Sequence, residues 1–73
     1  MNYWNLYKDV WDFHKKYADT KNTDDYYSAL ADESSRIAKT YGNHKFAVDL
    51  LLAVVNELER KSKEMANNAD KTV

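Results

Sequence analysis

The sequence predicts an all-α protein, a bundle of three helices, and three observations favour this class. Apolar residues recur at spacings of three and four along three segments, as they do on one face of a helix. The chain has one glycine and no proline, which argues against a turn-rich β fold. Residues 46–55 are apolar at nine of ten positions, so this stretch needs cover from several sides. We expect a single domain at residues 1–66 and a frayed or disordered tail at 67–73.

The first predicted helix spans residues 2–18 and is rich in aromatic side chains. Asn2 is its expected N-cap, because a short amide side chain can accept a hydrogen bond from the first turn. One line of residues at spacings of four and three is expected to pack inward, while Trp4 and Trp11 flank it. The members of this line are Tyr3, Tyr7, Val10, His14 and Tyr17.

The second and third predicted helices span residues 23–41 and 43–66. Thr23 is the expected N-cap of the second helix. Gly42 lies where helices often end with a left-handed residue, and Asn43 is the expected N-cap of the third helix. Such a short connection predicts an antiparallel helical hairpin. We expect the third helix to be the central element, with the other two packed against it.

Composition and charge argue against several classes of protein. The 73 residues include no cysteine, so disulfides and thiolate metal sites are excluded. The net charge is −1, with 11 basic and 12 acidic residues, whereas nucleic-acid-binding domains are normally basic. The apolar run of ten residues is far shorter than the roughly 20 that span a bilayer. The N-terminus does not resemble a signal peptide, so we expect a cytoplasmic protein without a membrane partner.

The sequence offers no evident catalytic constellation, and we expect no enzymatic activity, cofactor or metal. His14 and His44 do not have the spacing of a metal site. We expect His14 to be half-buried and to donate a hydrogen bond, and His44 to be exposed. Asp49 interrupts the apolar run and has two interpretations. It either faces solvent and pairs with Lys45 four residues earlier, or is partly buried against Arg36 or a tyrosine.

Four carboxylates, Asp32, Glu33, Asp49 and Glu57, resemble in part those of the all-α nucleotide pyrophosphohydrolases related to MazG. Those enzymes hold magnesium with a Glu-Glu-x-x-Glu motif on one helix and Glu-x-x-Asp on the next. Here Arg36 stands at the last position of the first motif, and the second motif has no match. Too few oxygen ligands remain for magnesium. The resemblance therefore implies a degenerate, carboxylate-metal-type protein as a second alternative function.

The aromatic surplus of the first helix is the feature that bears most on function. Six rings within fifteen residues cannot all face two neighbouring helices, so some should be exposed. Exposed tryptophan and tyrosine rings are typical anchors of protein interfaces. We therefore predict a non-enzymatic protein-interaction module whose protein partner is not identified by the sequence. The predicted partner-binding residues are Trp4, Tyr7, Lys8, Trp11 and Lys15.

Two other interpretations of these rings stay open. A small core can use large side chains simply to gain buried area, because a chain this short buries only roughly 60% of its unfolded surface. Alternatively, two copies of the chain can hide each other's exposed rings in a homodimer with a structural role.

Most of residues 2–60 resembles small proteins of prophages and other mobile elements of Gram-positive bacteria. That family has no established activity and supplies no site residues. The resemblance implies an accessory protein that binds a host or element protein, and an inhibitor of a bacterial defence system is one specific form. The segments that carry it are Asn2-Tyr3-Trp4, Trp11-Asp12-Phe13-His14-Lys15-Lys16, Asp32-Glu33-Ser34, Lys45-Phe46, Asp49-Leu50-Leu51-Leu52-Ala53-Val54 and Glu57-Leu58-Glu59.

Overall fold

The fold is an all-α three-helix bundle, as the sequence predicts. The computed structural model of the chain describes the backbone of residues 1–71 and the side chains of residues 1–65. Its helices are α1 (Tyr3–Lys16), α2 (Asp24–Thr40) and α3 (Lys45–Lys71), and the described backbone contains no strand. All three helices pack against one another.

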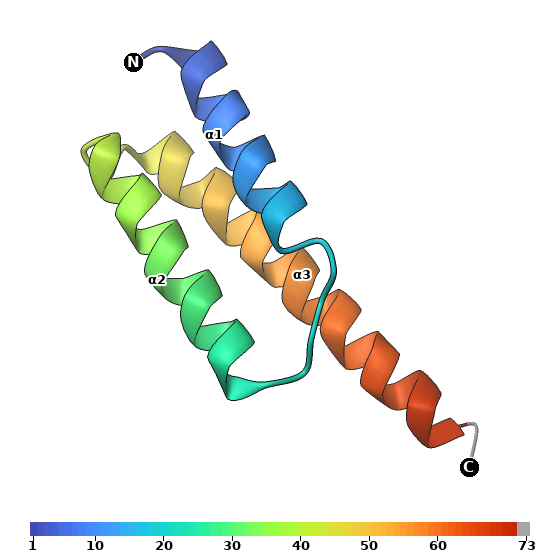
Figure 1. Cartoon of the computed structure of the whole chain (residues 1–73). Coiled ribbons are helices and arrows are strands. Elements are labelled where there is room, and N and C mark those ends of the chain that lie inside the picture. The colour runs from blue at the N-terminus through green and yellow to red at the C-terminus, as the bar shows by residue number, and fades with distance from the viewer. Residues whose placement is uncertain (72–73) are drawn as a thin grey trace.

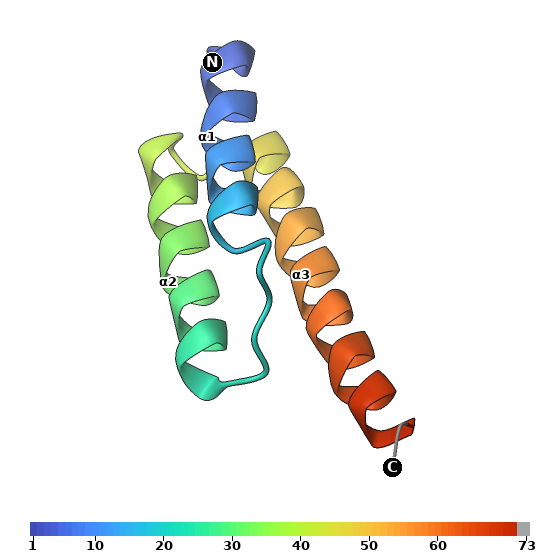
Figure 2. The same ribbon diagram turned by 45° about the vertical axis from the view of Figure 1, so that its right-hand side comes forward.

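The helices run down, up and down, so that α2 is antiparallel to both of its neighbours (Figure 1). The molecule is elongated, measuring 49 by 19 by 18 Å along its principal axes. In both views the first turns of α1 extend beyond the turn that joins α2 to α3 (Figure 2). The last turns of α3 extend beyond the start of α2 at the opposite end. Both overhanging parts have fewer neighbours than the middle of the bundle.

The core is formed by one apolar line from each helix. Its buried residues are Leu6, Val10 and Phe13 of α1, Tyr26, Leu30 and Ala38 of α2, and Ala47, Leu51 and Leu58 of α3. Burying a leucine, valine or phenylalanine leaves no polar side-chain atom to satisfy, whereas a buried tyrosine hydroxyl needs a partner. Tyr26 meets this need, because its hydroxyl donates to the Tyr17 carbonyl oxygen at 2.6 Å.

The predicted inward line of the first helix is wrong at its N-terminal end. Tyr3 is 56% exposed and Tyr7 is 51% exposed, while His14 and Tyr17 are half-buried and only Val10 belongs to the buried core. The inward line begins instead at Leu6, whereas the first turns of α1 extend beyond the turn that joins α2 to α3 (Figure 1).

The turn between α2 and α3 ends α2 before Gly42 as predicted. The N-cap of α3, however, lies one residue later than predicted. Gly42 adopts a φ of +65°, and its N–H donates to the Lys39 carbonyl at 3.0 Å. The Asn43 N–H donates to the Ala38 carbonyl at 2.8 Å, which completes a Schellman motif. Asn43 is not the N-cap, because it is also left-handed, with a φ of +54°. His44 caps α3 instead: its Nδ1 accepts from the Phe46 N–H at 3.2 Å.

The other predicted helix ends are close to those observed. The Asn2 side chain accepts from the Asn5 N–H at 3.0 Å, and the Thr23 hydroxyl accepts from the Tyr26 N–H at 3.2 Å, so both predicted N-caps are confirmed. The backbone of α3 continues to Lys71, beyond the expected end near residue 66. That the tail frays stays a prediction, and residues 72 and 73 lie outside the described residues.

The loop between α1 and α2 is fastened to α3 by polar side chains. Ser62 is only 1% exposed, and its hydroxyl donates to the Lys21 carbonyl at 3.0 Å and lies 2.9 Å from the Tyr27 hydroxyl. The Lys61 ammonium donates to the Ala18 carbonyl at 3.1 Å. These bonds join two loop carbonyls to α3 and thereby hold the segment after α1 against it.

Candidate interaction surface

The outer face of α1 carries an aromatic strip, defined here as Trp4, Tyr7 and Trp11. Spacings of three and four residues place these rings on one face of the helix, away from the buried line that begins at Leu6. The rings are 74%, 51% and 57% exposed in that order. The prediction that Trp4 and Trp11 lie outside the core is therefore confirmed. That a partner binds them stays a prediction.

Helix α3 supports one edge of the strip. The Tyr7 ring packs edge-on against Phe46, with 5.9 Å between ring centroids, and the neighbouring Tyr3 ring does the same at 5.7 Å. Such aromatic pairs contribute about 0.5–1.5 kcal/mol beyond the area they bury. These contacts hold the two tyrosines against α3 at the open end of the bundle. The contacts of Tyr3 and Tyr7 with Phe46 were not predicted from the sequence.

Lysine side chains border the other edge of the strip. Lys8 and Lys15 are both exposed and follow Trp4 and Trp11, respectively, by four residues. The Lys15 ammonium lies 5.6 Å from the centroid of the Trp11 ring and 3.5 Å from an Asp12 carboxylate oxygen. The ion pairs found within residues 1–65 do not include Lys8. All five predicted partner-binding residues thus lie together on one side of α1.

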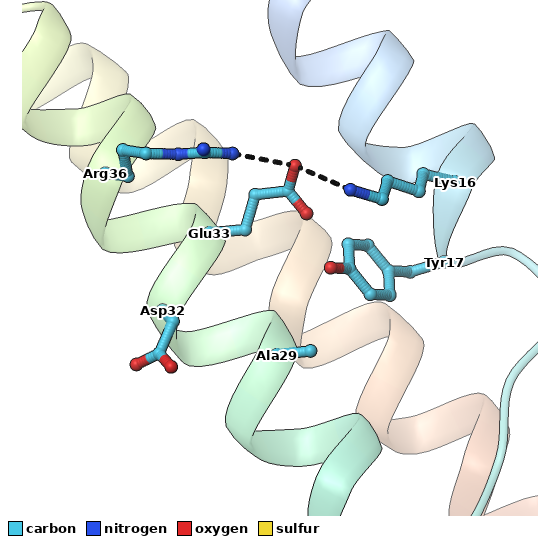
Figure 3. Close-up of a pocket in the computed structure, with 6 residues that line it drawn as sticks. All are labelled: Lys16, Tyr17, Ala29, Asp32, Glu33 and Arg36. Carbon is cyan, nitrogen blue, oxygen red and sulfur yellow. Dashed lines mark hydrogen bonds and ion pairs between the residues drawn. The ribbon is translucent and has the colours of Figure 1, made fainter.

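A separate hollow of about 330 Å³ lies between the end of α1 and α2, around the half-buried Glu33 (Figure 3). One oxygen of Glu33 accepts from Lys16 at 3.2 Å and from Arg36 at 3.1 Å. The other oxygen is buried without a hydrogen-bond partner among the side chains that the structure describes. The Tyr17 hydroxyl points toward this carboxylate (Figure 3). The charged side chains around the hollow therefore neutralise one another and join the two helices.

The pKa values of Tyr17 and Glu33 shift in opposite directions. The adjacent Glu33 carboxylate, together with burial, raises the pKa of Tyr17 to about 12. Burial alone would raise the pKa of Glu33, but Tyr17, Lys16 and Arg36 outweigh it and hold that pKa below its usual value. The carboxylate therefore stays ionised and the phenol stays protonated at neutral pH.

The four carboxylates that in part resemble those of the pyrophosphohydrolases are not gathered into one site. Asp49 faces solvent and accepts from Lys45 at 2.7 Å, which confirms the solvent-facing interpretation. Glu57 lies eight residues further along α3 and pairs with Arg60 at 2.8 Å. Within the part of the chain that the structure describes, no three histidine or acidic side chains are grouped as metal ligands would be.

The two histidines are placed as expected. His14 is half-buried, and its ring lies edge-on to Trp11 with 6.0 Å between centroids. No hydrogen bond from His14 is found among the described side chains, so its expected donation is not observed. His44 is exposed and serves as the cap of α3.

Comparison with known proteins adds no family to this description. No family model, curated protein or solved structure matches the chain. Among the described residues, no helix is both long enough and apolar enough to cross a bilayer.

Proposed function

We propose that the chain is a non-enzymatic protein-interaction module whose partner binds the aromatic strip, with Lys8 and Lys15 at its rim. The observation that carries the proposal is the exposure of three large rings along one helix face. Monomeric proteins rarely leave a contiguous apolar patch of this kind uncovered unless it binds something. Tryptophan and tyrosine are also the residues that most often dominate binding energy at protein interfaces.

The partner we propose is a protein of the bacterial host or of the mobile element itself. This part of the proposal rests on the resemblance of residues 2–60 to prophage proteins. An inhibitor of a host defence system is the specific form that this origin favours.

A capture experiment with two double variants tests the function. Tagged wild-type protein, Trp4→Ala/Trp11→Ala and Leu52→Ala/Met65→Ala are incubated with lysate of the organism that encodes the chain. Leu52 and Met65 are exposed to a similar degree, at 53% and 52%, but lie on α3. The module should capture a protein that the tryptophan variant loses and the α3 variant retains. Capture that survives in the tryptophan variant would contradict the proposal.

Circular dichroism and sedimentation complete the experiment. Loss of the helical signal in Trp4→Ala/Trp11→Ala would show that these rings stabilise the core, and would contradict the proposal. Reversible dimerisation across a hundredfold range of concentration, abolished by the same variant, would favour the homodimer over an external partner.

A further inference from the structure

The aromatic strip has the dimensions of a helix-binding surface. Its first and last rings, Trp4 and Trp11, are seven residues apart, which corresponds to about 10 Å along the helix axis. An amphipathic helix presents apolar side chains at matching intervals of three, four and seven residues. All three rings of the strip are more than half exposed, and the first turns of α1 extend beyond the turn that joins α2 to α3 (Figures 1 and 2).

The charges at the rim of the strip indicate which charge the bound helix should carry. The Lys15 ammonium lies 5.6 Å from the centroid of the Trp11 ring, Lys8 follows Trp4 by four residues, and both side chains are exposed. Asp12 pairs with Lys15 and offsets part of its charge, and Asp9 is half-buried and accepts a hydrogen bond from the Tyr41 hydroxyl. Lys8, in contrast, belongs to none of the ion pairs found among residues 1–65. The exposed phenol of Tyr7 adds a hydrogen-bond donor. Carboxylates complement this rim, whereas a basic partner would be repelled.

The same charges argue against a second copy of the chain as the occupant. In a twofold dimer the same patch meets itself. Lys8 lies near the midpoint of the strip, so an axis through that midpoint would bring the two Lys8 ammonium groups close together. Like charges placed opposite one another disfavour the pairing.

We infer that the occupant of the aromatic strip is an acidic amphipathic helix of another protein. Its apolar side chains pack on Trp4, Tyr7 and Trp11, and its carboxylates pair with Lys8 and Lys15. This inference rests on the proposed function and specifies the chemical character of the partner.

Intrinsic fluorescence tests the inference directly, because the chain's only two tryptophans both belong to the strip. The probes are two tryptophan-free peptides of about 18 residues, long enough to form a helix. Both carry leucine at spacings of three and four, and they differ only in having glutamate or lysine at the flanking positions. The acidic peptide should shift the emission to shorter wavelength and bind at least about tenfold more tightly than the basic one. Added salt should reduce this difference.

Charge reversal provides the matched control. Lys8→Glu/Lys15→Glu should invert the peptide preference and abolish capture of the partner from lysate. Lys39→Glu/Lys63→Glu changes the net charge equally, but at exposed positions on α2 and α3, and should retain both properties. Equal binding of the two peptides, or no binding of either, would overturn the acidic-helix inference. If Trp4→Ala/Trp11→Ala still abolished capture in that case, the proposed function itself would stand.

Other occupants give distinct results in the same assay. An emission shift that depends on protein concentration without any peptide would identify a second copy. A shift produced by phosphatidylglycerol vesicles or by a single-stranded oligonucleotide, but not by the acidic peptide, would identify a lipid surface or nucleic acid. Each of these results would overturn the inference.

Discussion

Leu6 and Trp4 are two residues apart on α1, and their replacement by alanine should have opposite consequences. Leu6 is 0% exposed, and its truncation removes three carbon atoms at about 0.8 kcal/mol each and leaves a cavity. Comparable core truncations cost about 2.7–5 kcal/mol. A chain of 73 residues has a total stability of only about 4–11 kcal/mol, so Leu6→Ala should remove a large part of it. Trp4 is 74% exposed, and Trp4→Ala should change stability by less than about 0.5 kcal/mol.

Urea unfolding followed by circular dichroism measures both changes. Leu6→Ala should lower the midpoint strongly at an unchanged slope, which would indicate a loss of stability without a change in the surface exposed. Trp4→Ala should superimpose on wild type. The assignment of the inner and outer faces of α1 fails if Trp4→Ala costs as much as Leu6→Ala, or if Leu6→Ala costs under about 1 kcal/mol.

Three further predictions concern the turn, the loop and the tyrosines. Gly42→Ala should lower the free energy of unfolding by about 1–2 kcal/mol in a thermal melt, because φ is +65° there while nothing lies within 4 Å of the added Cβ. Ser62→Ala should cost about 1–3 kcal/mol in urea unfolding, since the Lys21 carbonyl loses its buried donor. Stability should also fall as the pH rises from 10 toward 12. Hydrogen bonding to Asp9 raises the pKa of Tyr41 to about 12, so between these values the unfolded state has lost a proton that the folded state keeps. Denaturation at stepped pH should show a smaller fall in Tyr41→Phe.

The sequence predicts the helices well because their signals are local. The periodicity of apolar residues and the caps at Asn2, Thr23 and Gly42 each depend on a few consecutive residues. The prediction places the N-cap of α3 at Asn43, one residue too early, because asparagine suits two conformations, an N-cap and a left-handed turn residue. The backbone takes the second, and the histidine that follows becomes the cap.

The candidate surface is less predictable because its arrangement depends on contacts between helices. On α1, the predicted inward line that begins at Tyr3 lies beside the buried line that begins at Leu6. Periodicity alone does not say which of the two lines faces the core. The structure decides it through the overhang of α1 and the contact of Tyr7 with Phe46, nearly forty residues away in the sequence. The pairing of Glu33 with Lys16 also joins two helices and has no signal within either segment.

The fastening of the loop by Ser62 requires α3 to run at least the full length of its antiparallel neighbour. Helix α3 has 27 residues and α2 has 17, and Lys61 and Ser62 are the seventeenth and eighteenth residues of α3. Removing α3 from residue 61 onward would leave the helical hairpin complete but would release the loop carbonyls of Ala18 and Lys21. The end of α1 would then lose its attachment to α3. We therefore expect the shortest form that keeps the loop attached to α3 to extend past Ser62, although the proposed partner surface lies at the other end of the bundle.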